Sequence, residues 1–181
     1  DVQNKLGADI IMAFDECVPY PSSPDRLRQA VERTIRWAEQ SRAAHRRGDQ
    51  WMFGIVQGGT DRELRSICSA ELRKLDFPGY AIGGLSVGES KAEMYHTLDL
   101  LMPQLPRHKA RYLMGVGSPE DLLEGAARGI DIDQYTVALE KITHLRGVHG
   151  RGGFVAFDDI ILPGRWNARW RPYRCSPSAA W

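Results

Sequence analysis

The chain has 181 residues, of which 43% are hydrophobic and 26% are charged, and its formal net charge at pH 7 is +1. This length and composition suit one globular domain with its own core. The small net charge excludes a protein drawn to nucleic acids or membranes by its overall field, so any contact with nucleic acid must depend on local groups. No apolar run approaches the ~20 residues that a membrane-spanning helix needs. The first residues, DVQNKLGAD, lack the pattern of a signal peptide.

The chain has an odd number of cysteines, and they are far apart: Cys17, Cys68 and Cys175. This distribution argues against a disulfide framework and favours a reducing compartment, so we expect a cytoplasmic protein. Because there is no CxxC pair, we expect no closed zinc site, and so no metal site, in this chain. Cys68 lies on the apolar side of a predicted helix and is expected to be a core residue.

Four apolar runs of strand length occur along the chain, and each is followed by polar or glycine residues and then by a helix start. The runs are IIMAF at 10–14, MFGIV at 52–56, GYAI at 79–82 and RYLMGV at 111–116. This alternation predicts an α/β fold with a mainly parallel sheet. A doubly wound open sheet and a (β/α)8 barrel both fit the pattern.

The helices between these runs are predicted to begin at capping residues, which are Ser23, Thr60, Ser90 and Ser118. Thr60 with Glu63 and Ser90 with Glu93 have the spacing of a capping box. Pro24 follows Ser23 at the first helical position, where proline is favoured.

Polar and glycine residues fall at the carboxyl ends of the predicted strands, where both architectures bind ligands. These residues are Asp15, Gln57, Gly83 with Gly84, and Gly115. This position favours a site at the carboxyl ends of the strands. From position alone, Asp15 could equally cap the next turn, Gln57 could be a loop amide and the glycines could make a tight turn.

Four segments, MAFDECVPYP, FGIVQGG, GYAIGGLSVGE and YLMGVGSPEDL, resemble the signature segments of the tRNA-guanine transglycosylase family, in family order over residues 1–131. The resemblance implies a (β/α)8 TIM barrel with a zinc-bearing insertion. It also implies exchange of a guanine at the anticodon wobble position of tRNA for a 7-deazaguanine, in queuosine biosynthesis. A carboxylate nucleophile would link to the ribose without an external cofactor. The implied partners are tRNA, guanine and the 7-deazaguanine base, and family members often pair as homodimers.

The resemblance assigns substrate-binding roles to Asp15, Cys17, Gln57, Gly84, Leu85 and Met114. A carboxylate can accept both adjacent N–H donors of a guanine edge, and its charge strengthens these bonds. An amide offers a donor and an acceptor to another edge, and the glycine N–H would meet the base carbonyl. Leu85 and Met114 would form apolar walls.

Two further residues bear on which base is used. FDEC with Cys17 and SVGE with Val87 resemble bacterial members, which implies 7-aminomethyl-7-deazaguanine as the incoming base. The alternative is that Val87 only packs the turn.

The segment GVGSPED resembles the part of the family that touches the tRNA backbone. Its residues are Gly115, Val116, Gly117, Ser118, Pro119, Glu120 and Asp121. Backbone N–H groups at a helix start suit phosphate. The alternative is an ordinary turn between a strand and a helix.

The chain departs from the family pattern at both ends. The family barrel begins before residue 1, so we expect a partial barrel that lacks the first strands and the aspartate proposed as general acid/base. After residue 131 the nucleophile position falls on Gln134 without a gap, and on Asp133 with a deletion of one residue. A glutamine amide cannot act as this nucleophile, which leaves Asp133 as the candidate catalytic residue.

The last part of the chain, residues 132–181, is expected to be a divergent segment, as from a shifted reading frame. The family's zinc-binding cysteines are missing there, and Cys175 stands alone. The stretch GGFVAFDDIILP, at 152–163, is predicted to form one or two strands.

Three functions follow from these features. The first is a tRNA-guanine transglycosylase. The second is a catalytically incomplete fragment or non-catalytic subunit that keeps the base pocket. The third, an unrelated α/β enzyme that binds phosphate at its glycine turns, is disfavoured because the four motifs occur together and in order.

Overall fold

The computed structural model describes residues 2–134, 154–155 and 159–161. Its sheet has seven strands in the order β1-β2-β3-β4-β5-β7-β6. The first five are parallel to their neighbours, whereas β7 is antiparallel to β5 and β6 is antiparallel to β7. The strands are β1 (Ile10–Met12), β2 (Trp51–Val56), β3 (Gly79–Ile82), β4 (Ala110–Leu113), β5 (Ile132–Gln134), β6 (Phe154–Val155) and β7 (Asp159–Ile161).

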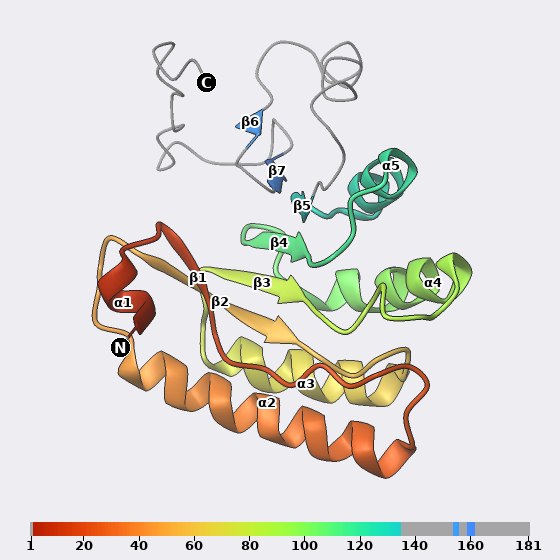
Figure 1. Cartoon of the computed structure of the whole chain (residues 1–181), viewed down its shortest axis with the longest axis horizontal. Helices are drawn as coiled ribbons and strands as arrows, with labels where there is room; N and C mark the ends of the chain where they lie inside the picture. The colour runs from red at the N-terminus through yellow and green to blue at the C-terminus, as the bar shows by residue number, and fades with distance from the viewer. Residues whose placement is uncertain (1, 135–153, 156–158, 162–181) are drawn as a thin grey trace.

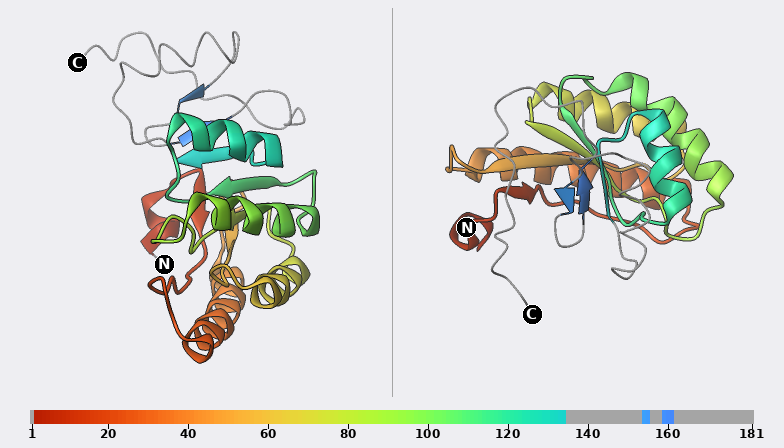
Figure 2. Two further views of the ribbon diagram at one scale, coloured as in Figure 1. Left: turned by 90° about the vertical axis from the view of Figure 1, so that its right-hand side faces the viewer. Right: turned by 90° about the horizontal axis from the view of Figure 1, so that it is seen from above.

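Helices connect the parallel strands. The connecting helices are α2 (Pro24–Ala44), α3 (Arg62–Lys74), α4 (Lys91–Leu101) with the 3-10 turn η1 (Met102–Gln104), and α5 (Pro119–Arg128). A short helix, α1 (Val2–Leu6), precedes β1. Helices α2 to α5 each cover the same face of the sheet, side by side along its curve (Figures 1 and 2). The parallel strands follow one another in chain order without the reversal of a doubly wound sheet. The predicted α/β fold is therefore confirmed as a partial (β/α)8 barrel.

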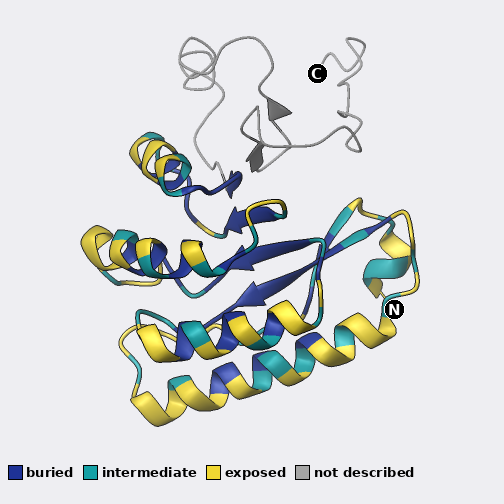
Figure 3. Ribbon diagram, turned by 180° about the vertical axis from the view of Figure 1, so that it is seen from behind, coloured by how far each residue is buried: buried dark blue, intermediate teal, exposed yellow. Residues whose placement is uncertain are grey.

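Successive side chains of each strand contribute to two different cores. One core lies between the sheet and the helices and includes Val56, Ile82 and Leu113. The other lies on the opposite face and includes Ile55 and Tyr112. Strands β2 to β4 are almost wholly buried, while each long helix exposes one side (Figure 3). This is the two-sided burial expected of parallel strands.

Three of the four predicted helix caps are confirmed. The side chains of Ser23, Ser90 and Ser118 each accept a hydrogen bond from a backbone N–H of the first turn, and Ser90 with Glu93 forms the full capping box. The prediction for Thr60 is wrong, because the cap of α3 is Asp61, whose Oδ1 accepts the N–H of Leu64 at 2.8 Å. The Asp61 N–H donates to the Gly58 carbonyl at 3.0 Å and so closes the preceding glycine turn. This turn brings the Asp61 carboxylate over the start of the helix.

Cys68 is a core residue, as predicted, with no exposed surface. Its Sγ also accepts a hydrogen bond from the backbone N–H of Gln57 at 3.3 Å. Burial raises the pKa of the Cys68 thiol to about 11, because the thiolate would lose its water. The thiol therefore stays neutral at pH 7 and supports the backbone just beyond β2.

The predicted strands within 152–163 are confirmed as β6 and β7. Otherwise the predicted divergent segment lies largely outside the described residues, so its boundary at residue 131 stays a prediction. No helix in the described ranges has both the length and the apolar character needed to span a bilayer.

Candidate functional site

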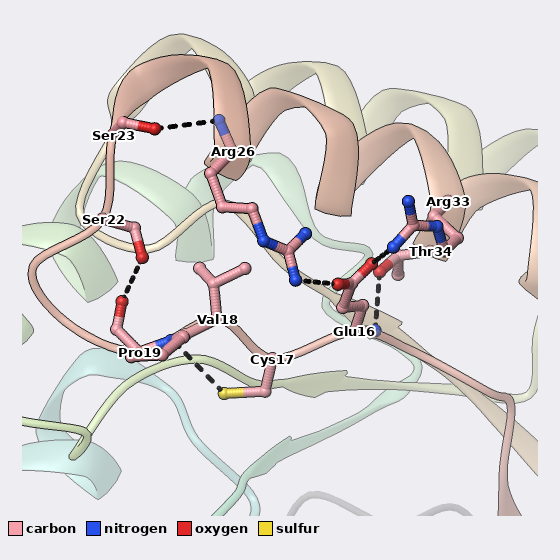
Figure 4. A network of polar contacts seen from close by, with 9 residues as sticks. All are labelled: Glu16, Cys17, Val18, Pro19, Ser22, Ser23, Arg26, Arg33 and Thr34. Atoms are coloured by element: carbon pink, nitrogen blue, oxygen red, sulfur yellow. Dashed lines mark hydrogen bonds and ion pairs between the residues drawn. The ribbon is translucent and has the colours of Figure 1, made fainter.

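The segment that follows β1 is fixed to α2 by Glu16. Its carboxylate forms ion pairs with Arg26 and Arg33, and its backbone N–H donates to Thr34 Oγ1 at 3.0 Å (Figure 4). The hydrogen bond from Arg26 is the main reason that the pKa of Glu16 lies below its ordinary value. Glu16 is thus committed to the helix layer, and its neighbour Asp15 has a different partner.

Asp15 pairs with Gln57, which follows β2. Gln57 Nε2 donates to Asp15 Oδ2 at 2.6 Å, and the Gln57 side chain is only 2% exposed. Burial raises the pKa of Asp15, and the bond from Gln57 acts in the opposite direction. A carboxylate and an amide therefore meet at the carboxyl end of the sheet, as the sequence predicted.

The turn after β3 lies directly against this pair. The Gly83 N–H donates to the Val56 carbonyl at 3.1 Å, which extends the contact between β2 and β3. A β-carbon at Gly83 would lie 2.6 Å from Gln57 Nε2, and one at Gly84 would collide with Gln57 Oε1. Gly84 also has a φ of +66°, which side chains other than glycine rarely adopt. Three successive strands thus bring Asp15, Gln57 and Gly84 together, although their roles in binding stay predictions.

The other predicted substrate-binding residues are placed differently from one another. Cys17 is exposed as a residue, but its thiol is partly buried. This partial burial, followed by the charge of Asp15, raises the pKa of the thiol, whereas Arg65, the Gly84 backbone and the Gln57 side chain act in the opposite direction. Met114 is half-buried and packs against the core on the face away from the helices. Its N–H donates to the Ile82 carbonyl at 3.1 Å.

Leu85 is 3% exposed and belongs to the core between sheet and helices. Its side chain is therefore used for packing in that core.

The predicted RNA-binding segment divides into exposed and buried residues. Gly115 and Glu120 are exposed, Ser118 and Pro119 are half-buried, and the remaining members of the segment are buried: Val116, Gly117 and Asp121. The Asp121 carboxylate accepts hydrogen bonds from Tyr95 Oη at 2.7 Å and from Ser118 Oγ at 2.8 Å, and it forms an ion pair with Lys91. Asp121 therefore joins α5 to α4.

We expect Asp121→Asn to lower the free energy of unfolding by about 1–3 kcal/mol, because Lys91 and Tyr95 would lose a buried charged acceptor. Burial alone would raise the pKa of Asp121, but these bonds together hold it below its ordinary value. The folded state thus binds this proton less tightly than the unfolded state. The contribution of the Asp121 carboxylate to the stability of the fold is therefore fully present above the ordinary aspartate pKa. It is lost as the pH falls through the lowered pKa of the folded state.

Urea unfolding between pH 3 and pH 7 measures this effect. The exposed neighbour Glu120 provides the control, since Glu120→Gln should change the stability by no more than about 0.5 kcal/mol. Equal unfolding midpoints for Asp121→Asn and the wild type at pH 7 would contradict the structural role of Asp121.

Asp133, the predicted nucleophile, lies in β5 and has no exposed surface. Its two carboxylate oxygens are each 3.5 Å from the place of a β-carbon on Gly125, in the middle of α5. Its neighbour Ile132 belongs to the core on the opposite face of the sheet. The carboxylate thus faces the helix layer and does not join Asp15 and Gln57, which argues against Asp133 as the nucleophile.

One residue close to this group was missed by the sequence analysis. Arg65 is 2% exposed and donates hydrogen bonds to the segments that carry Gln57 and Gly84. The available signal was an arginine next to Leu64 and three residues before Cys68, on the apolar side of a predicted helix.

The described residues do not fit the zinc site that the family resemblance implies. In residues 2–134, 154–155 and 159–161, no three His, Cys, Asp or Glu side chains are grouped so that they could hold a metal ion. Cys175 lies outside these ranges.

Comparison with known proteins gives one consistent family. The family model described as Queuine tRNA-ribosyltransferase matches residues 1–139. A curated relative of that name from Pelotomaculum thermopropionicum is 61% identical over 132 residues, which are 73% of this chain and 36% of the relative. Relatives of the same name from Halothermothrix orenii and Geobacillus kaustophilus are 57% and 59% identical over 72% and 73% of the chain.

The chain spans 36% of the length of the first of these relatives and 35% of the other two. The matched part contains β1 to β5 together with Asp15, Gln57 and Gly84. Because the family model covers most of its length, the chain belongs to the queuine tRNA-ribosyltransferase family.

Proposed function

We propose that this protein exchanges the guanine at the anticodon wobble position of certain tRNAs for 7-aminomethyl-7-deazaguanine. The observation that supports this proposal best is the group at the carboxyl ends of β1, β2 and β3. Asp15 Oδ2 lies 2.6 Å from Gln57 Nε2, and the Gly84 backbone is packed against the same amide. The name of the relatives, queuine tRNA-ribosyltransferase, agrees with this reaction.

The chemistry of guanine suits these three groups. Its adjacent ring N–H and amino donors match the two oxygens of the Asp15 carboxylate. When the base binds, this carboxylate would give up its hydrogen bond from Gln57 and accept these two donors instead. Gln57 can then turn its donor and acceptor to another edge of the ring. The Gly84 N–H lies at the Cys17 thiol in this structure and would bind the base carbonyl in its place. The partial burial of Asp15 reduces competition from water, so each of these bonds is stronger than it would be at an exposed position.

The covalent step needs a second carboxylate, because Asp15 is assigned to the base. The Asp133 carboxylate, which faces α5, is not placed beside the three groups assigned to the base. The second candidate function rests on this placement: the chain would bind the base without completing the exchange. The two candidates share the base pocket and differ only in the transfer to tRNA.

The exposed part of residues 115–120 would contact the tRNA backbone next to this pocket. Gly115 is exposed with a φ of +72°, and the first turn of α5 begins at Pro119. The start of a helix favours phosphate through its free N–H groups. The free thiols of Cys17 and Cys68 suit a reducing compartment, and we place the protein in the cytoplasm.

One pair of measurements tests both candidates. The chain is mixed with labelled guanine and unmodified tRNA, and guanine binding is measured by calorimetry in parallel. Binding together with label in the tRNA is the result expected of the enzyme. Binding without label is the result expected of a base-binding subunit, and absence of binding would contradict both. A tRNA that lacks guanine at the wobble position is the matched control and should take up no label.

A further inference from the structure

Arg65 is a buried cationic residue in the first turn of α3, three residues after the helix begins at Arg62. Only 2% of it is exposed, although arginine is among the residue types that are least often buried. Burial lowers the pKa of Arg65 to about 10, because the charged form loses its water. The guanidinium therefore remains charged at neutral pH inside the core.

All three nitrogens of this guanidinium donate to backbone carbonyls. Nε donates to Gly59 at 2.7 Å, Nη1 to Val56 at 2.8 Å and Nη2 to Gly84 at 3.4 Å. Val56 and Gly59 lie on either side of Gln57 in the chain, and Gly84 belongs to the turn after the next strand. One planar group thus ties the segment that carries Gln57 to the turn that carries Gly84.

The contact between this segment and α3 is close. A β-carbon on Gly58 would lie 2.7 Å from the backbone nitrogen of Arg65. The turn after β2 therefore rests directly on the first turn of α3, at the backbone of Arg65. Because the fork of an arginine is rigid, its donors fix the separation of the carbonyls that they bind.

We propose that Arg65 is a positioning residue that sets the distance between the Gln57 amide and the Gly84 backbone N–H, and so the width of the slot for the base. The inference rests on the proposed function, because it concerns the fit of the same base. Arg65 lies behind the slot and acts only through the two segments that it holds. A lysine at this position keeps the charge, but a single ammonium cannot span the three carbonyls.

Calorimetry with guanine tests the proposal in the full chain. Arg65→Lys is expected to raise the Kd for guanine about tenfold while the stoichiometry of binding stays that of the wild type. A purely structural role would give the opposite pattern, with fewer binding-competent molecules and an unchanged Kd. Arg62→Lys is the matched control, since Arg62 is exposed on the same helix, and it should leave both quantities unchanged.

The outcomes separate this inference from the proposed function. If the wild type binds no guanine, the proposed function fails and the inference with it. If the wild type binds but Arg65→Lys has the same Kd, only the inference is overturned.

If Arg65→Lys does not fold, the wild type itself provides the test. The NMR signal of the Arg65 Nε–H group is followed as guanine is added. A shift that saturates with guanine supports the positioning role, and an unmoved signal at saturation overturns it.

Discussion

Asp15→Asn is expected to weaken guanine binding by at least about 100-fold, which is ~2.7 kcal/mol at 1.36 kcal/mol for each factor of ten. The substitution keeps the shape of the side chain but replaces an acceptor oxygen by an NH₂ donor, which would meet the donors of the base. It also removes the charge that strengthens the remaining bond. Calorimetry with guanine measures the effect. Asp9→Asn, at an exposed position just before β1, is the control and should bind guanine like the wild type.

The same substitution should not weaken the fold. Burial raises the pKa of Asp15, so the folded state binds this proton more tightly than the unfolded state does. The charged carboxylate is thus a cost to folding at neutral pH, and that cost falls as the pH is lowered through the raised pKa. Guanine binding has the opposite dependence, since it needs the carboxylate and should be lost over that same interval. An Asp15→Asn protein with normal stability and normal guanine affinity would remove Asp15 from the site.

Gly84→Ala is expected to affect both the fold and the site. The positive φ of Gly84 alone should cost about 1–3 kcal/mol of unfolding free energy in any residue with a side chain. In addition, the new methyl group would collide with Gln57 Oε1 and push the amide away from its place beside Asp15. We expect the affinity for guanine to fall more than about tenfold, as when a buried hydrogen bond is lost.

A glycine with similar backbone strain separates these two effects. Gly7 has a φ of +75°, and the nearest atom to a β-carbon there is the flexible end of Arg47, at 3.0 Å. Gly7→Ala should therefore lower the stability without changing the affinity for guanine. Urea unfolding and calorimetry on the two variants give the comparison. Equal guanine affinities for both would show that the contact between Gly84 and Gln57 does not shape the slot.

Much of the fold could be predicted from the sequence because its signals are local. Apolar runs of strand length, followed by Ser23, Ser90 and Ser118 in capping positions, depend only on neighbouring residues. They located the strands β1 to β4 and the starts of three helices correctly. The cap of α3 was misplaced by one residue, because the preceding glycine turn decides which side chain reaches the free N–H groups.

Sequence motifs also indicated which residues would meet at the carboxyl ends of the strands. Asp15, Gln57 and Gly84 come from three consecutive strands, and parallel neighbours in a barrel bring such positions together by geometry alone. The partner of each group was not predictable, however. That Glu16 bonds to α2 while Asp15 bonds to Gln57 depends on where α2 packs against the sheet.

By itself, then, the sequence determined the alternation of strands and helices, the family, and which residues lie at the carboxyl ends of the strands, because these follow from local patterns and motifs. Only the tertiary structure decided which carboxylates face the site. One residue of a strand points to the core next to the helices and the next residue points to the opposite core, so Asp133 is directed at α5. Likewise, only packing could show that Arg65 binds carbonyls from two strand ends, since Val56, Gly59 and Gly84 are brought together by the sheet and not by the chain.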